Sequence, residues 1–220
     1  MVKLVANTSP LITRENGDKL TLEDLIVYIA KVSNPNNQLN TETSSKLIRY
    51  LIKHNHWSPF EHISLTLEIK TSRAIAAQLL RHRSFTFQEF SQRYSQSTSF
   101  EDIEWRLQGK TNRQVGDEEV DLSPELKDQV DNTLATCKEL YDNLIDKGLA
   151  KECARMVLPL CTSTTLYMTG TLRSWIHYLE LRTAADTQKE HRYIAVQIED
   201  ILMKEFPNVF VALQPEKDYN

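Results

Sequence analysis

Apolar side chains recur at every second position in one stretch of the chain. Between residues 63 and 70 the apolar positions are Ile63, Leu65, Leu67 and Ile69, and polar residues stand between them. This period of two puts the apolar side chains on one face of a β-strand. The pattern therefore predicts a strand with one buried face over residues 63–70.

Elsewhere the apolar residues recur at helical spacing. Thr21 is a typical N-cap residue, and it precedes Glu23 and Asp24, which the positive end of a helix dipole favours in the first turn. A helix is therefore predicted over residues 22–32. The same reasoning predicts further helices over residues 43–54, 72–83, 124–148, 151–157, 172–182 and 186–206.

Other segments have weaker patterns. Residues 84–91 lack a clear period and are interpreted as a loop, and residues 93–107 are expected to hold one or two strands. Residues 162–171 are rich in threonine and fit either a strand or a loop. Because no linker stands out, the chain is expected to form a single domain over residues 1–220. Its fold class would be α/β of the α+β type, mostly helical with a small sheet.

The composition is ordinary for a globular protein, with 40% hydrophobic and 25% charged residues. The 5 glycines make a glycine-rich phosphate-binding loop unexpected. The longest apolar run, residues 25–30, is too short for a membrane span, and no secretory signal is visible. Cys137, Cys153 and Cys161 lack the spacing of a disulfide framework or zinc site. A reducing, cytoplasmic setting is expected.

The charge is unevenly distributed along the chain. The formal net charge is −4, but residues 70–93 carry +4, with Glu89 as their one acid, which leaves −8 on the remainder. A local basic cluster in an acidic protein predicts a small anionic ligand. Nucleic acid is not expected as a partner, because proteins that grip its backbone usually carry a wider basic surface.

The densest part of this cluster is Arg-His-Arg at residues 81–83. Arginine stays charged at physiological pH and binds phosphate oxygens in bidentate fashion. Charges this close repel one another unless an acid or an anion offsets them, and Glu89 and a bound phosphate are both candidates. Ser91 adds a hydroxyl that can orient a ligand. A solvated helix end is the alternative, but the polar residues at 88–93 favour a site.

A second polar segment, residues 56–62, reads His-Trp-Ser-Pro-Phe-Glu-His. Its proline stiffens a turn into the predicted strand, where His56, Ser58 and Glu61 would present donors and acceptors to a ligand. A metal site is the alternative at the three nearby histidines, His54, His56 and His62. No acid completes that set, so no metal is expected.

Four more candidates lie in the C-terminal half: Arg155, Arg173, His177 and Arg182. Arg173 and His177 are four residues apart and therefore share a helix face. Arg182 lies about 180° round an ideal helix from Arg173 and is predicted to serve a different surface. Salt bridges to Glu180 or Glu190 are the alternative role for these arginines.

Together these motifs resemble the flavin-dependent thymidylate synthases. Residues 81–91 match that family's R-H-R-x7-S signature. Two neighbouring segments also look like the family's. They are H-x-S-P-F-E-H at residues 56–62, before the signature, and E-x-S-x-R-Y-S at residues 89–95, which overlaps the end of the signature. The same holds for A-K-V-S at residues 30–33, A-R-M-V-L-P at residues 154–159 and the segment ending L-E-L-R at Arg182. The similarity runs from about residue 25 to residue 200.

The resemblance implies an enzyme that converts dUMP to dTMP. Methylenetetrahydrofolate would supply the carbon and leave as tetrahydrofolate, and NADPH would supply reducing equivalents through FAD. The resemblance also implies a homotetramer whose subunits have a central, mostly antiparallel sheet wrapped by helices. Each active site would draw on more than one subunit.

The resemblance further implies roles for individual residues. Arg182 corresponds to the arginine that activates the uracil ring, and it is assigned to catalysis together with Ser91. His56 corresponds to a residue near the flavin and the folate. FAD contacts are implied for Ser33, His56, Ser58, Glu61, Arg81, His82, Arg83, Glu89, Thr171, Arg173 and His177. Contacts with dUMP are implied for Gln78, Arg81, Glu89, Phe90, Ser91, Gln92, Arg93, Arg155 and Arg182.

Some positions depart from the family's pattern. Thr171 stands where the family usually has asparagine, and a hydroxyl replaces only part of an amide's hydrogen bonding. His177 is a larger donor than the asparagine of some members. Phe85 and Phe87 either stack on a base or flavin or pack in the core.

Two other functions are kept as hypotheses. A non-catalytic nucleotide- or RNA-binding module would use the same arginine cluster but would bind no flavin. A cysteine-dependent thymidylate synthase would use Cys161 as its nucleophile, which requires a nearby base or cation to lower the pKa of the thiol. The sequence puts no such group beside Cys161, so a small buried residue is the favoured interpretation.

Overall fold

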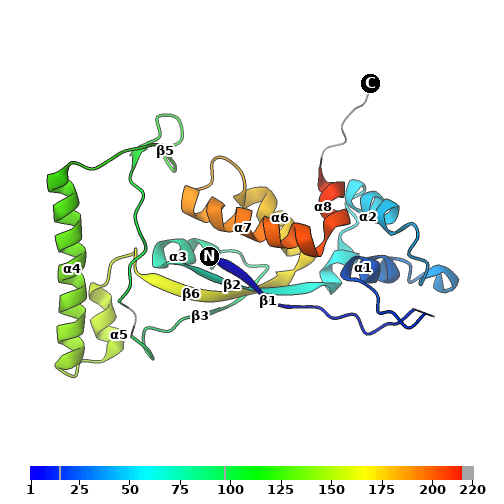
Figure 1. Ribbon diagram of the computed structural model, residues 1–220, viewed down its shortest axis with the longest axis horizontal. Helices are drawn as coiled ribbons and strands as arrows, with labels where there is room; N and C mark the ends of the chain where they lie inside the picture. The colour runs from blue at the N-terminus through cyan, green and yellow to red at the C-terminus, as the bar shows by residue number, and fades with distance from the viewer. Residues whose placement is uncertain (15, 97, 215–220) are drawn as a thin grey trace.

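The centre of the fold is an antiparallel sheet. The computed structural model describes residues 1–14, 16–96 and 98–214. Within these residues the sheet has four strands in the order β1–β2–β6–β3 (Figure 1). They are β1 (Val2–Asn7), β2 (Ser64–Ser72), β6 (Ser163–Thr171) and β3 (Thr86–Glu89). The strand predicted over residues 63–70 is confirmed, and it lies in the middle of the sheet.

Strands β2 and β6 pair along their whole length, from Ser64 opposite Thr171 to Ser72 opposite Ser163. Alternate residues of both strands are buried. The sequence left β6 open between strand and loop because two of its buried positions, Thr164 and Gly170, are not large apolar residues. Gly170 must lack a side chain, since a Cβ atom there would stand 2.4 Å from a ring carbon of Phe85.

Helices cover one face of the sheet and pack at one of its ends (Figure 1). Those over the strands are α3 (Arg73–Leu79), α6 (Leu172–Arg182) and α7 (Lys189–Glu205). Those at the end are α1 (Leu22–Ala30), α2 (Ser44–Lys53) and α8 (Pro207–Leu213). The predicted α1 is confirmed with its cap, because the Thr21 side chain accepts a hydrogen bond from the Asp24 backbone N–H at 3.1 Å.

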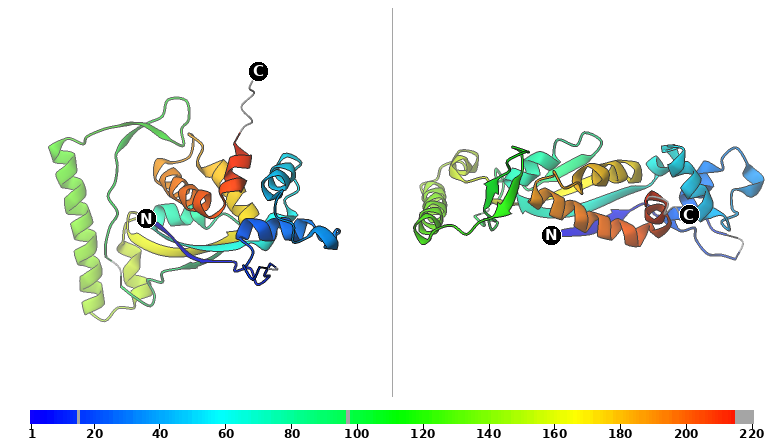
Figure 2. Two further views of the ribbon diagram at one scale, coloured as in Figure 1. Left: turned by 45° about the vertical axis from the view of Figure 1, so that its right-hand side comes forward. Right: turned by 90° about the horizontal axis from the view of Figure 1, so that it is seen from above.

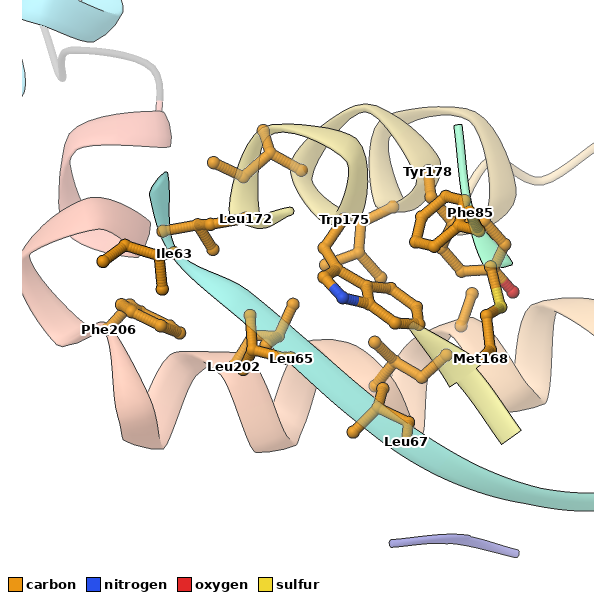
Figure 3. Close-up of a cluster of buried hydrophobic side chains, with 14 of the residues drawn as sticks. Ile63, Leu65, Leu67, Phe85, Met168, Leu172, Trp175, Tyr178, Leu202 and Phe206 are labelled. Atoms are coloured by element: carbon orange, nitrogen blue, oxygen red, sulfur yellow. The ribbon is translucent and has the colours of Figure 1, made fainter. Parts of the chain in front are cut away.

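The hydrophobic core lies between the sheet and helices α6 and α7 (Figure 3). Trp175 and Leu67 are fully buried, and the ring of Phe85 stands edge-on to that of Trp175 with the centroids 4.6 Å apart. Phe87 packs partly buried against the same core. Both phenylalanines therefore pack in the core, which is one of the two roles considered for them.

Three elements differ from the sequence interpretation. Residues 86–89, expected in a loop, form the edge strand β3, which is too short for its pattern to show a period. Strand β1 was not predicted, because most of its residues are exposed and carry no buried alternation. Helix α8 was not predicted because it follows α7 after Phe206 alone, with Pro207 at its favoured first position.

A long segment between residues 100 and 160 leads away from the sheet (Figures 1 and 2). It holds the hairpin of β4 (Arg106–Gln108) and β5 (Gly116–Glu119), then α4 (Pro124–Asp146) and α5 (Lys151–Ala154). Tyr141 is the one buried residue of the 23 in α4. This helix therefore packs little against the rest of its own chain.

No helix in the described part of the chain is both long and apolar enough to cross a bilayer.

Candidate active site

The Arg-His-Arg motif occupies the turn between α3 and β3. Helix α3 ends at Leu79, whose carbonyl accepts a hydrogen bond from the His82 backbone N–H at 3.0 Å. Arg81 and Arg83 are exposed there, and in the described part of the chain neither guanidinium has a carboxylate within ion-pairing distance. Two guanidinium groups that are close in sequence and unpaired among the described residues favour an anion at this turn.

Glu89, expected as a counter-charge for these arginines, has another partner. Its carboxylate accepts from Arg73 Nη1 at 2.8 Å and from Thr164 Oγ1 at 3.0 Å. Arg73 also donates to the Phe90 carbonyl at 2.9 Å. The counter-charge interpretation of Glu89 is therefore wrong within one chain, because β3 pairs with β6 and so turns Glu89 toward α3 rather than toward the Arg-His-Arg turn.

The last residue of α6 reaches the same turn. Arg182 Nε donates to His82 Nε2 at 3.0 Å, although the two residues are 100 apart in sequence. Arginine has no acceptor atom, so Nε2 of His82 must be unprotonated. Burial, and then the charge of Arg182, lower the pKa of His82 to about 4. His82 is therefore neutral at physiological pH, and the remaining guanidinium N–H groups of Arg182 have no partner among the described residues.

A buried network lies beside this pair. Tyr178 on α6 is 2% exposed, and its hydroxyl lies 3.1 Å from Nε2 of the fully buried His191 on α7. Nδ1 of His191 lies 3.2 Å from Oε1 of Gln78 on α3. Burial first, then the charges of Arg182 and of His82, lower the pKa of His191 to about 4. The structure thus brings the predicted Gln78, His82 and Arg182 into one cluster.

His191 was missed by the sequence reasoning. It stands on the buried face of the predicted helix, in register with Ala195, Ile198 and Leu202. A histidine in an otherwise apolar helical stripe was the available signal, since a buried imidazole needs hydrogen-bond partners. Its partners are on other helices, so the sequence could not name them.

A second group surrounds the segment of residues 58–62. Arg173 Nη1 donates to Glu61 at 2.5 Å, and the His177 ring stands edge-on to Trp57 with centroids 5.2 Å apart. A groove of about 570 Å³ runs beside Trp57 and His177. Arg173 and His177 thus share a face of α6, while Arg182 faces His82, as their spacing predicted. Ser33 and His56 are exposed in loops, and Ser58 is exposed at the start of the 3-10 helix Ser58–His62.

Thr171 has a structural role in this region. As the N-cap of α6, its hydroxyl accepts from the Ser174 backbone N–H at 3.2 Å and lies 3.1 Å from the Ser174 hydroxyl. These bonds occupy the hydroxyl within its own chain.

A third group lies where the chain leaves β3. Arg93 pairs with Glu152 of α5 at 3.2 Å, and Ser91 is exposed while its carbonyl accepts from two backbone N–H groups. Nε2 of Gln92, next to Arg93 in sequence, and Nε of Arg155, at the end of α5, are buried and have no partner among the described residues. Buried donors without partners mark positions where a ligand or another chain is expected to supply an acceptor.

The remaining alternatives find little support. In the described part of the chain, no three His, Cys, Asp or Glu side chains lie close enough together to hold a metal ion. Burial is the main reason why the pKa of the Cys161 thiol is raised. The thiol is therefore less acidic than usual, which is the opposite of what a cysteine nucleophile requires.

Comparison with known proteins identifies the family. The family model described as thymidylate synthase complementing protein matches residues 18–208. The chain is 50% identical over 218 residues, 96% of it and 97% of the relative, to a "Probable flavin-dependent thymidylate synthase" of Paramecium bursaria Chlorella virus 1. The chain belongs to the flavin-dependent thymidylate synthase family. A Synechocystis flavin-dependent thymidylate synthase is 48% identical over 217 residues, covering 97% and 99% of the two chains.

A solved structure has the same fold as this member of the flavin-dependent thymidylate synthase family. The crystal structure of a UMP/dUMP methylase, PolB from Streptomyces cacaoi, bound with 5-Br dUMP, matches with a TM-score of 0.79. The two chains are 27% identical, and the match covers 96% of this chain and 93% of that one. The overall arrangement of sheet and helices is therefore shared by the two proteins.

The two neutral histidines make the stability of this family member depend on pH. Each has a folded-state pKa of about 4, whereas an unfolded histidine titrates near 6.5. Below about pH 6.5 these histidines bind protons in the unfolded chain but stay neutral in the folded chain. The free energy of unfolding therefore falls as the pH drops toward about 4, by at most about 1.4 kcal/mol per pH unit for each histidine. Urea unfolding at a series of pH values checks this.

A matched control is His62→Gln, which changes an exposed histidine and leaves His82 and His191 in place. A free energy of unfolding that stays constant between pH 5 and pH 6.5 contradicts the prediction.

Proposed function

We propose that this protein methylates dUMP to dTMP, with methylenetetrahydrofolate as the carbon donor and NADPH as the reductant through FAD, and releases tetrahydrofolate. The observation that carries the proposal is the hydrogen bond from Arg182 to His82, which joins the Arg-His-Arg turn to the end of α6. The names of the relatives, flavin-dependent thymidylate synthases, and of the structural neighbour, a dUMP methylase, support it.

Arg182 is proposed to activate the uracil ring. Methylation at C5 needs an electron-rich ring, and a permanently charged guanidinium beside the ring nitrogen and carbonyls would stabilise its deprotonated form. His82 is a neutral acceptor and orients the guanidinium without neutralising it. Ser91, with its exposed hydroxyl, would orient the nucleotide. The other proposed dUMP contacts are Gln78, Arg81, Glu89, Phe90, Gln92, Arg93 and Arg155.

The residues around the turn fit a flavin dinucleotide. Arg81 and Arg83 lack acid partners among the described residues, and guanidinium groups in that state suit a pyrophosphate. Bound FAD would supply the hydride chemistry. The other residues proposed to hold it are Ser33, His56, Ser58, Glu61, His82, Glu89, Thr171, Arg173 and His177. Glu89 and Thr171 already have partners in the chain, so their contacts would be additional.

A homotetramer is proposed because parts of one chain are incomplete alone. Helix α4 buries Tyr141 but leaves Leu126 51% and Leu140 44% exposed. Gln92 and Arg155 have buried nitrogens without acceptors among the described residues. Neighbouring copies of the chain would cover the helix and complete the sites. Residues 1–220 are proposed as one functional domain acting in the cytoplasm, with neither nucleic acid nor membrane as a partner.

The test is the absorbance of the purified protein between about 350 and 500 nm, where flavins absorb, before and after dUMP is added. Flavin bands that shift with dUMP, followed by dTMP formation on addition of methylenetetrahydrofolate and NADPH, are expected. A protein that stays colourless after incubation with FAD contradicts the proposal. That result would favour the non-catalytic nucleotide- or RNA-binding module that uses the same arginines.

Cysteine chemistry is separated from this proposal by Cys161→Ala. Because the thiol has a raised pKa, the substitution is expected to change dTMP turnover by less than about twofold, whereas loss of a nucleophile costs orders of magnitude. The exposed Cys153→Ala is the matched control. Abolished turnover in a folded Cys161→Ala protein, with Cys153→Ala unaffected, would restore the cysteine-dependent hypothesis.

A further inference from the structure

His191 makes two hydrogen bonds that point in opposite directions through the core. On one side it meets the amide of Gln78, and on the other the hydroxyl of Tyr178. It is 0% exposed, so no solvent replaces a lost bond. Through these contacts His191 ties α7 to α3 and to α6, the helices that flank the Arg-His-Arg turn.

These hydrogen bonds belong to a row that begins at Glu190, and the direction of each one can be worked out from there. Glu190 is held by Arg106 at 2.5 Å, and a carboxylate accepts only. Gln188 therefore turns its nitrogen toward Glu190, at 2.9 Å, and its oxygen toward Gln78. The Gln78 nitrogen donates to that oxygen at 2.6 Å, which leaves the Gln78 oxygen facing His191.

The protonation of His191 is then determined. The Gln78 oxygen can only accept, so His191 must carry its hydrogen on Nδ1. Nε2 is therefore an acceptor, and Tyr178 donates its hydroxyl hydrogen to it at 3.1 Å. The low pKa of His191, about 4, means that this neutral tautomer persists at physiological pH.

We propose that His191 is a positioning residue for the nucleotide: by donating from Nδ1 it holds the Gln78 amide with its second N–H free for the substrate. The inference rests on the proposed function, because Gln78 is a proposed dUMP contact. A Gln78 amide has two N–H groups, and Gln188 takes one. Without His191 the Gln78 oxygen faces no donor, so the bond to Gln188 alone holds the amide and its second N–H is no longer fixed toward the substrate.

Two conservative variants separate these contacts. In His191→Asn the amide nitrogen takes the place of Nδ1 and can still donate to Gln78, but nothing reaches Tyr178. In His191→Gln the amide reaches the place of Nε2 and Tyr178, but nothing donates to Gln78. The dissociation constant of dUMP from the FAD-loaded protein is measured through the flavin absorbance. It is expected to stay within about twofold of wild type for His191→Asn and to rise about tenfold for His191→Gln.

A control separates positioning from mere stability. Leu202→Ala removes a fully buried side chain of the same helix, away from the cluster, and is expected to lower the melting temperature without weakening dUMP binding. Equal weakening of dUMP binding in His191→Asn and His191→Gln, or no weakening in either, overturns the proposal. So does weakening of dUMP binding in Leu202→Ala to the extent seen in His191→Gln.

A measurement on the wild-type protein needs no variant to fold. Nitrogen-15 NMR of the histidine side chains in the FAD-loaded protein is expected to show His191 neutral and protonated on Nδ1 at pH 7. A proton on Nε2 overturns the proposal even if the protein methylates dUMP. If the wild-type flavin spectrum does not respond to dUMP, the proposed function fails instead, and the inference fails with it.

Discussion

Arg182→Ala is expected to lower dTMP turnover by about 10²- to 10³-fold, the usual cost of removing a group that stabilises developing negative charge. Flavin retention should change little, because Arg81 and Arg83, the arginines proposed to bind the pyrophosphate of FAD, are left in place. Turnover and the flavin-to-protein absorbance ratio are the measurements. The pKa of His82 is also expected to rise, since the Arg182 charge is one of the two causes that lower it.

Two variants sharpen this result. Arg182→Lys keeps the charge but loses the planar fork and the Nε–H that bonds His82, so an intermediate turnover is expected. Arg192→Ala is the matched control. Arg192 lies in the first turn of α7 and donates to the Ala185 carbonyl at 3.0 Å rather than to His82. Joint loss of flavin and turnover in Arg182→Ala would mean that Arg182 serves structure rather than chemistry.

Replacing Leu126 and Leu140 together by lysine is expected to break the proposed homotetramer and to lower turnover more than about tenfold. Both side chains are half exposed in one chain, so the substitutions cost the isolated subunit little, but buried in an interface the two charges would cost several kcal/mol. Light scattering gives the assembly size, and circular dichroism checks that the helices remain. Turnover is measured on the same samples.

Leu11→Lys is the matched control for this pair. Leu11 is 83% exposed and precedes α1, away from α4, so the same change of chemistry should alter neither size nor turnover. A double variant that keeps its assembly size and activity would show that α4 is not an interface.

Much of the fold could be predicted because each element carries its own local pattern. Strand β2 alternates apolar and polar residues, and α1 has a cap at Thr21 and acids in its first turn. Such signals act between residues a few positions apart, which is why they can be seen without any tertiary structure. The edge strand β3 lacked a signal because its short sequence is stabilised by pairing with β6.

In the candidate site, too, local patterns could be predicted from the sequence and distant partners could not. The spacing of Arg173, His177 and Arg182 on one helix was enough to predict that the first two share a face and the third does not. The partners of these residues could not be predicted in this way, because Glu61 lies 112 residues from Arg173 and His82 lies 100 residues from Arg182. The pairing of Glu89 with Arg73 was missed for a similar reason, since it depends on how β3 is turned in the sheet.

The sequence by itself determined the family, the central strand and the helices other than α8, and the arginines and histidines that make the chain a candidate methylase of dUMP. These follow from motif spacing and from periodicity, which are local properties of the chain. Only the tertiary structure decided which of these groups are neutral, which way their hydrogen bonds run, and that His191 belongs with them. Those properties depend on burial and on partners from other helices, because the pKa of an imidazole and the direction of its hydrogen bonds are set by whatever surrounds it.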